Sequence, residues 1–304
     1  MIVIVAPGQG SQTPGFLNPW IVEPAFRDRL VGMSDAAGID LLKHGSVSDS
    51  DTIRNTSIAQ PLIVAAGLLT FAALTADGRL DRIGGVAGHS VGEITAAAAA
   101  GILSETDAVA FVRERGVAMA DAAALEPTGM SAVIGGDEAA LLARLSELGL
   151  APANFNGGGQ LVVAGSLDGL AALADKPVQG TRVIPLQVAG AFHTHYMEPA
   201  VARLAAFAAT LTPADPSIPI WTNRDGSTVT SGTAFLELLV GQVSSPVRWD
   251  RTMDALAAAG VTGIIELAPA GALVGLAKRG LKGVPTLAVK TPDDLQSAFD
   301  MIDE

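Results

Sequence analysis

The stretch that most constrains the fold is Gly-His-Ser-Val-Gly-Glu at residues 88–93, which contains the pattern Gly-x-Ser-x-Gly. An apolar, β-leaning run precedes it at 83–87, and a strong helix-forming run follows it at 93–103. This context predicts a nucleophile elbow, in which the chain turns sharply from a strand into a helix and holds Ser90 at the tip. Glycine at 88 and 92 leaves room for the turn, and the start of the helix offers N–H groups that suit an oxyanion. The alternative is a chance match on a Gly/Ser turn.

Composition excludes several classes of function. The chain has 304 residues, is 49% hydrophobic and contains no cysteine, so it can bury a large core but has no disulfide, thiolate metal site or cysteine nucleophile. A net charge of −12 and only 4% aromatic residues argue against nucleic-acid binding. The apolar stretches at 61–74 and 94–103 are shorter than the roughly 18–20 residues that span a bilayer, and the apolar first residues carry no basic leader. We therefore expect a cytoplasmic protein with no membrane contact.

The order of the predicted elements indicates the fold class. Strands alternate with helices in the first part of the chain and again near its end, which is typical of a mostly parallel sheet. Between them, residues 127–187 predict the order β-α-β-β-α-β of a ferredoxin-like unit. We expect an α/β-hydrolase-like parallel-sheet core, formed by residues 1–126 and 188–304, with a small ferredoxin-like subdomain inserted at 127–187. The expected strands are 1–6, 83–87, 130–134, 152–156, 160–164, 183–187, 218–222 and 263–267, and Ser166 is expected to cap the helix 166–174.

Ser90 requires a base, and the chain has four histidines. His89 adjoins Ser90 and should point away from it, and His44 lies in a polar, turn-rich region. His193 and His195 remain, and their spacing does not choose between them. A metal site at this His-x-His pair is the alternative, but no cysteine is available and no third ligand is evident.

A hydrolase triad would also need an acid between Ser90 and the histidine. Between Ser90 and His193 the acids fall on predicted helices, on turns or in the small subdomain, and Asp168 and Asp175 are possible but unconvincing candidates. A backbone carbonyl or an amide side chain could orient the base instead.

Arg115 lies on the apolar face of the predicted helix 105–123, whereas Arg113 lies on its polar face. A buried guanidinium needs a carboxylate or comparable acceptors. Two readings follow: a structural ion pair with a buried Asp or Glu, or a clamp for a substrate carboxylate.

The loop Gly8-Gln9-Gly10-Ser11-Gln12 follows the first predicted strand. It matches neither a Walker loop nor Gly-x-Gly-x-x-Gly, so nucleotide binding is weakly supported. Because loops at the carboxyl ends of parallel strands line active sites, Gln9 and Ser90 should meet there.

With these residues in hand, the chain resembles the malonyl-CoA:acyl carrier protein transacylases of fatty acid and polyketide synthesis, in their stand-alone bacterial form. Motifs from Pro7 to Arg279 carry the resemblance, which spans nearly the whole chain. They are Gly-Gln-Gly-Ser-Gln at 8–12, Gly-His-Ser-x-Gly-Glu at 88–93, Arg115-Gly116, Asn-Phe-Asn at 154–156, Phe192-His193, and Ser-Pro-Val-Arg-Trp at 245–249.

The resemblance implies a role for each site residue. Ser90 is the nucleophile and His193, rather than His195, is the base. Gln242 orients the imidazole through its main-chain carbonyl, which accounts for the missing acid. Gln9 and the N–H of Val91 form the oxyanion hole.

The resemblance also implies the substrate contacts. Arg115 binds the free carboxylate of malonate, and Phe192 crowds the α-carbon and disfavours methylmalonate. Gly190 stands where malonyl-selective members have a histidine, which weakens that last expectation.

The implied reaction is ping-pong malonyl transfer from malonyl-CoA to the phosphopantetheine thiol of an acyl carrier protein, with no metal or other cofactor. Carrier proteins are usually acidic, so we expect docking near the basic cluster, which we define as Lys278, Arg279 and Lys282. The alternative for this cluster is a solvated helix end. Rival functions are an esterase or thioesterase, a non-catalytic binding subunit, and transfer to a dedicated polyketide carrier.

Overall fold

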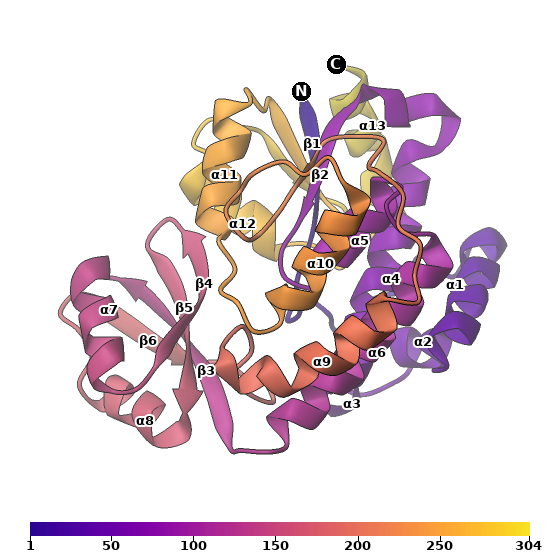
Figure 1. Ribbon diagram of the computed structural model, residues 1–304. Coiled ribbons are helices and arrows are strands. Elements are labelled where there is room, and N and C mark those ends of the chain that lie inside the picture. The colour runs from indigo at the N-terminus through magenta and orange to yellow at the C-terminus, as the bar shows by residue number, and fades with distance from the viewer.

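Two β-sheets, one parallel and one antiparallel, organise the chain, and the computed structural model describes them over residues 1–304 (Figure 1). The parallel sheet has the strand order β7-β2-β1-β8-β9. Its strands are β1 (Ile2–Ala6), β2 (Ile83–Gly88), β7 (Ile220–Trp221), β8 (Gly263–Glu266) and β9 (Thr286–Ala288).

Helices cover both faces of this sheet. Successive side chains of a strand point to opposite faces. Val3 and Val5 of β1 pack in one cluster with α11 and α12, whereas Ile4 and Ala6 join the larger core with α4, α5 and α6. Burial on both faces explains why β1 is apolar throughout rather than alternating. The helices around the sheet are α1 (Pro24–Ala37), α2 (Leu41–Ser46), α3 (Ser50–Arg54), α4 (Thr56–Thr75), α5 (Gly92–Ala99), α6 (Glu105–Ala123), α9 (Glu198–Ala208), α10 (Gly232–Gln242), α11 (Trp249–Ala258), α12 (Ala272–Gly280) and α13 (Leu295–Asp303).

Helix α4 is longer than the apolar stretch at 61–74 because it begins at Thr56. Together with the turn that follows, it is long and apolar enough to cross a membrane. However, 78% of its apolar window is buried inside the protein, where it packs against α6 and α5. It is therefore a core helix.

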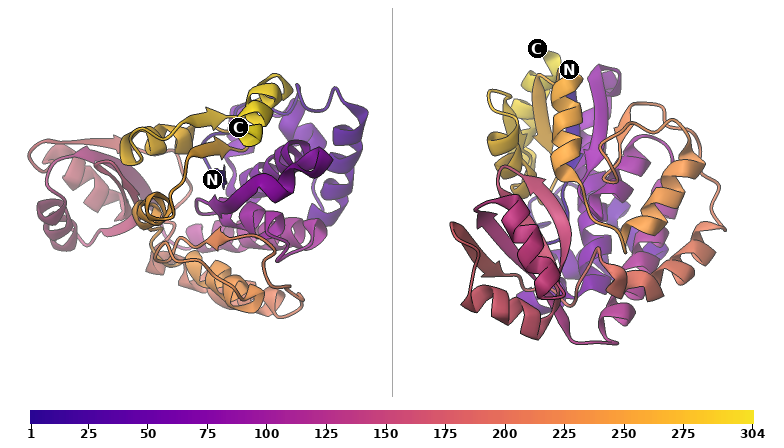
Figure 2. Two further views of the ribbon diagram at one scale, coloured as in Figure 1. Left: turned by 90° about the horizontal axis from the view of Figure 1, so that it is seen from above. Right: turned by 60° about the vertical axis from the view of Figure 1, so that its left-hand side comes forward.

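The antiparallel sheet projects to one side of the parallel one (Figure 2). Its strand order is β4-β5-β3-β6, and the chain order is β-α-β-β-α-β, as the sequence predicted. Helices α7 and α8 pack on one face through residues such as Leu141 and Leu173, while Met130 and Ala132 on the other face join the main core. The elements are β3 (Thr128–Gly135), α7 (Glu138–Glu147), β4 (Ala151–Gly157), β5 (Gln160–Ser166), α8 (Leu167–Asp175) and β6 (Thr181–Pro185).

The local predictions hold with some shifts. Helix α6 has the predicted bounds, and the Ser166 hydroxyl accepts the Gly169 N–H at the start of α8. The helix predicted to reach residue 103 ends at Ala99, because Gly101 adopts φ +80°. Strand β6 lies two residues before its predicted place. Strand β9 escaped prediction because it is a three-residue, half-buried edge strand.

Candidate active site

The turn between β2 and α5 has the geometry of a nucleophile elbow. Ser90 adopts φ +53° at its tip, in the left-handed region that L-residues rarely visit. A Cβ on Gly88 would lie 2.0 Å from the carbonyl carbon of Gly92, and a Cβ on Gly92 would lie 2.2 Å from the Ala6 oxygen. Both distances are impossible contacts, so the two glycines are what allow β1, β2 and α5 to meet at this point.

The Ser90 Oγ lies 2.7 Å from the His193 Nε2. On the other side of the ring, the His193 Nδ1 lies 2.9 Å from the main-chain oxygen of Gln242. A carbonyl only accepts, so Nδ1 carries the hydrogen and Nε2 is free to accept the Ser90 proton. Burial, and secondly the positive charge of Arg115, lower the pKa of His193 to about 3, which keeps the imidazole neutral.

The backbone at His193 is also in the left-handed region, with φ +62°, and its N–H donates to the Val243 oxygen over 3.0 Å. This bond ties the imidazole to the segment that follows α10. His195, two residues later, is exposed and stacks on Tyr196 at 4.2 Å between ring centroids. The two histidines of the His-x-His pair therefore diverge, and only His193 reaches Ser90.

Neither of the other two histidines bonds the Ser90 Oγ. His89 is half-buried beside the elbow, where its Nε2 lies 2.9 Å from the Asn156 Oδ1 and its ring meets the Trp249 ring edge-on. It links the elbow to strand β4 and thus to the small sheet. His44 lies in α2, and its Nδ1 lies 3.0 Å from the Ser48 hydroxyl.

The two acids considered from the sequence are not part of this arrangement. Asp168 and Asp175 lie exposed at the two ends of α8, on the outer side of the small sheet. The partner of the His193 Nδ1 is instead the Gln242 carbonyl. A buried dipole replaces the buried charge of a triad.

Arg115, in α6, is 1% exposed, and its guanidinium points at the Ser90 hydroxyl. Its Nη1 donates to the Gln60 Oε1 over 2.6 Å, and its Nη2 donates to the Gln242 Oε1 over 2.8 Å and to the Ser90 Oγ over 3.4 Å. Its Nε has no partner. No carboxylate bonds it directly, and burial lowers the pKa of Arg115 to about 10. An unneutralised guanidinium beside Ser90 is suited to bind an acyl group that carries its own carboxylate.

Two main-chain N–H groups near Ser90 have no hydrogen-bond acceptor within the protein. Neither the N–H of Gln9 nor that of Val91 is donated to another group of the protein, and the Gln9 side chain donates instead to the Arg54 oxygen over 3.3 Å. Val91 directly precedes the first residue of α5, so its N–H lies at the positive end of that helix. These groups can stabilise an oxyanion.

Ser90 and His193 open into a cavity of about 520 Å³ between the two sheets. Phe192 is buried in the cavity wall. Arg279, an exposed member of the basic cluster, also borders the cavity and donates to the Gln160 Oε1 over 3.3 Å. The wall draws on the loops after β1 and β2, on strands of the small sheet and on α12. Its members are Gly8–Ser11, His89, Ser90, Met130, Ala132, Asn154, Asn156, Gln160, Val162, Leu186, Val188, Phe192, His193, Gly271–Leu273, Gly275, Leu276 and Arg279.

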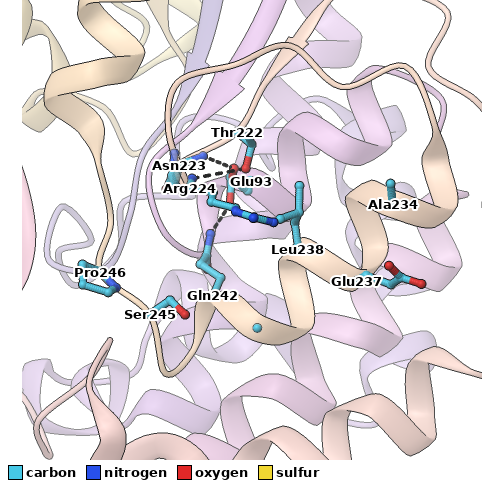
Figure 3. A pocket seen from close by; sticks show the side chains of 11 residues that line it. Glu93, Thr222, Asn223, Arg224, Ala234, Glu237, Leu238, Gln242, Ser245 and Pro246 are labelled. Atoms are coloured by element: carbon cyan, nitrogen blue, oxygen red, sulfur yellow. Dashed lines mark hydrogen bonds between the residues drawn. The ribbon is translucent and has the colours of Figure 1, made fainter.

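The sequence reasoning missed three buried polar residues. Gln60 holds Arg115, as described above. The Asn223 Oδ1 accepts the Ser90 N–H over 2.7 Å, and its Nδ2 donates to the Gly88 oxygen over 2.6 Å, so this side chain fixes the elbow. Glu93 lies beside Asn223 and Gln242 (Figure 3). Asn223 follows a predicted strand and Glu93 is a lone acid in an alanine-rich helix, and both signals were present in the sequence.

Comparison with known proteins places this geometry in context. Residues 3–294 match the acyl transferase domain family. The chain is 50% identical over 305 residues to the malonyl CoA-acyl carrier protein transacylase of Mycobacterium tuberculosis, covering 99% of this chain and 100% of that relative. It superposes on the crystal structure of the M. tuberculosis protein with a TM-score of 0.95, over 98% of this chain and 99% of that one. A malonyl-transacylase solved in complex with a type II polyketide acyl carrier protein gives 0.93 at 29% identity, over 99% of both chains.

Proposed function

The chain belongs to the family of malonyl-CoA:acyl carrier protein transacylases, and we propose that Ser90 carries the malonyl group between the two thiols of this reaction. The enzyme moves malonyl from CoA to the carrier's phosphopantetheine thiol and so supplies extender units for fatty acid synthesis. The single observation that carries the proposed residue roles is the 2.7 Å contact between Ser90 and a His193 held by a main-chain carbonyl.

In the first half-reaction, the Ser90 oxygen attacks the thioester carbonyl of malonyl-CoA while its proton passes to the His193 Nε2. The N–H groups of Gln9 and Val91 stabilise the tetrahedral oxyanion. The carbon–sulfur bond then breaks, CoA leaves with the proton returned by His193, and malonyl-Ser90 remains. In the second half-reaction, the carrier's thiol gives its proton to His193, its sulfur attacks the ester, and Ser90 recovers the proton as it leaves.

Arg115 makes this chemistry depend on the substrate carboxylate. The charge of Arg115 is one cause of the low pKa of His193. When the malonyl carboxylate pairs with Arg115, that charge is compensated, so His193 becomes a better base. An acetyl group leaves the guanidinium unpaired and the base weak. Selectivity thus acts on the rate of acylation as well as on binding.

Phe192 supports selection against branched extenders. It is buried in the wall of the cavity that holds Ser90. An added methyl at the α-carbon would press against this ring, and a packed wall yields only at a cost. Phe192→Ser should therefore gain methylmalonyl transfer. A variant that gains none would count against a role for this ring.

We also propose where the carrier protein docks and in which compartment the reaction takes place. All three residues of the basic cluster, Lys278, Arg279 and Lys282, are exposed, and Arg279 borders the cavity. We propose that the acidic carrier docks at this cluster and that the reaction takes place in the cytoplasm.

We also propose that residues 127–187 form a small subdomain inserted into a large one made of residues 1–126 and 188–304, since β3 to β6 all fall within 127–187.

The test is intact-protein mass spectrometry after brief mixing with malonyl-CoA, followed by the phosphopantetheinylated carrier. We expect a malonyl adduct on the wild type that moves to the carrier, no adduct on Ser90→Ala, and a normal adduct on Ser11→Ala, which changes another serine that borders the same cavity. Loading with acetyl-CoA should be much slower. An adduct lost mainly to water would indicate a hydrolase, and no adduct from any acyl-CoA would refute the proposed chemistry.

A further inference from the structure

The mechanism leaves one buried carboxylate unused. Glu93 is 1% exposed, three residues after Ser90 at the start of α5. It accepts the Asn223 N–H over 2.6 Å and a short hydrogen bond from the Gln242 Nε2 (Figure 3). Burying a charged carboxylate is costly unless its contacts are well made. Its place directly behind the nucleophile therefore calls for an explanation.

The side chain of Gln242 connects Glu93 to Arg115. Its Nε2 donates to Glu93 and, over 3.1 Å, to the main-chain oxygen of Ser90, while its Oε1 accepts the Arg115 Nη2–H over 2.8 Å. An amide has donors at one end and an acceptor at the other. A carboxylate facing the amide nitrogen therefore leaves only the oxygen for the guanidinium.

We propose that Glu93 is a positioning residue for the substrate carboxylate: by fixing the orientation of the Gln242 amide, it holds Arg115 toward the acyl group on Ser90. The inference rests on the proposed function and deepens it. It assigns specificity for a carboxylate-bearing acyl group to three buried side chains in contact, Glu93, Gln242 and Arg115, rather than to Arg115 alone.

The protonation state of Glu93 determines which way the Gln242 amide is oriented. Burial raises the pKa of Glu93 to about 7, against the stabilising hydrogen bonds from Asn223, Gln242 and Thr222 and the nearby charge of Arg115. Once protonated, one carboxyl oxygen becomes a donor and can no longer accept all of these bonds. The Gln242 amide can then rotate so that its NH₂ group faces Arg115. Both groups are hydrogen-bond donors, so Arg115 would lose the bond that holds it.

A second cavity, of about 400 Å³, gives the solvent a separate approach to Glu93. Glu93, Asn223 and Gln242 border it, and neither Ser90 nor His193 does. The other charged residues that face Glu93 across this cavity are Arg224, from the loop after β7, and Glu237, from α10. A proton can therefore reach Glu93 without entering the acyl-binding cavity.

The experiment follows Ser90 loading by rapid-quench mass spectrometry from about pH 5.5 to about 8.5 with malonyl-CoA and, over longer times, acetyl-CoA. For the wild type, we expect kcat/KM for malonyl loading to rise with an inflection near pH 7, whereas acetyl loading should lack that inflection. Glu93→Gln, whose amide cannot act as a pure acceptor, should lose the inflection and lower the preference for malonyl by about tenfold. Glu237→Gln changes a carboxylate that borders the same cavity and has no hydrogen bond to Gln242, so it is the matched control and should behave as the wild type.

Three results would overturn the proposal: equal losses for both substrates in Glu93→Gln, an inflection that persists in that variant, or wild-type profiles of the same shape for both substrates. The last comparison needs no variant, so it stands even if Glu93→Gln does not fold. Absence of any malonyl adduct on the wild type would be a different failure, that of the proposed function itself.

Discussion

At the scale of single residues, Gln242 serves two parts of the site with two different groups. Its main-chain oxygen orients His193, and its side chain bonds both Arg115 and Glu93. In the proposed mechanism, acid–base chemistry and carboxylate binding therefore depend on the same residue at the end of α10. A substitution that keeps the backbone of Gln242 but changes its amide should separate the two.

Arg115→Ala is expected to lower kcat/KM for malonyl loading by at least about a hundredfold, because the substrate carboxylate loses its only cationic partner in a buried site. Acetyl loading should hold steady or rise, since removing the positive charge also removes one cause of the low pKa of His193. Single-turnover loading with each acyl-CoA measures both effects. Arg113→Ala, on the same helix but bonded to the Ser57 oxygen, is the control and should change neither. Equal losses for both acyl groups would argue against a carboxylate clamp.

Glu93 should also make the stability of the fold depend on pH. Its folded-state pKa of about 7 lies above the ordinary value of 4.5, so the folded state binds the proton more tightly than the unfolded state. The stability it contributes is complete below the ordinary value and is lost as the pH rises through about 7. Relative to Glu93→Gln, the wild-type free energy of unfolding should fall by roughly 3 kcal/mol between about pH 5 and pH 8. Urea denaturation of both proteins at each pH tests this, and a constant difference would contradict it.

At the scale of elements, the elbow is a close junction of β1, β2 and α5. Ser90 and His193 both hold left-handed backbone conformations that cost on the order of 1 kcal/mol or more each. Asn223 and the Val243 carbonyl fix these two positions by hydrogen bonds. Hydrogen bonds from segments far apart in the sequence thus stabilise the two strained residues.

Gly92→Ala should destabilise the protein severely, because the new Cβ would lie 2.2 Å from the Ala6 oxygen and only movement of β1 or α5 could relieve the contact. Overpacking commonly costs 1–3 kcal/mol, and we expect at least about 3 here, where the obstacle is backbone. The matched control is Gly32→Ala, at an exposed position of α1 with nothing near its Cβ. That change should stabilise by about 0.5–1 kcal/mol. Thermal melts of both variants give the comparison, and a Gly92→Ala protein as stable as the wild type would show that the junction is not tight.

Helix α12 is held by a carboxylate of the neighbouring strand. Glu266, at the end of β8, is fully buried and accepts the N–H groups of Gly271, Leu273 and Val274 over 2.9–3.0 Å. A negative charge at the start of a helix satisfies its free N–H groups and its dipole. This contact fixes the helix that forms one wall of the cavity and carries Lys278 and Arg279.

At the scale of the whole molecule, the active site lies where the two sheets face each other, and neither sheet forms it alone. The protein carries a net charge of −12, so an acidic carrier is repelled overall. The basic cluster is a local exception at the edge of the cavity. We expect it to set the orientation of the incoming carrier.

Reversal of the basic cluster to Glu should raise the KM for the carrier by about tenfold or more, while loading of Ser90 from malonyl-CoA stays the same. Added salt should raise the wild-type KM and affect the variant less, since exposed charges are screened. Steady-state kinetics of each half-reaction at two ionic strengths measure this. The control reverses Arg144, in helix α7, and Arg182, in strand β6, neither of which lines the cavity. If loading and transfer fall together, the cluster has a structural role instead.

The sequence alone determined the fold class, the elbow and the place of Arg115 on the apolar face of α6, because each depends on local pattern: an apolar run, two glycines at fixed spacing, and one arginine on an apolar helical stripe. The sequence also reduced the candidates for the base to His193 and His195, and only the family resemblance favoured His193. The tertiary structure decided what no local pattern encodes. Gln242, Asn223, Glu93 and Gln60 come from four separate segments, and their roles arise only when packing brings them around Ser90 and removes the water that would otherwise satisfy them.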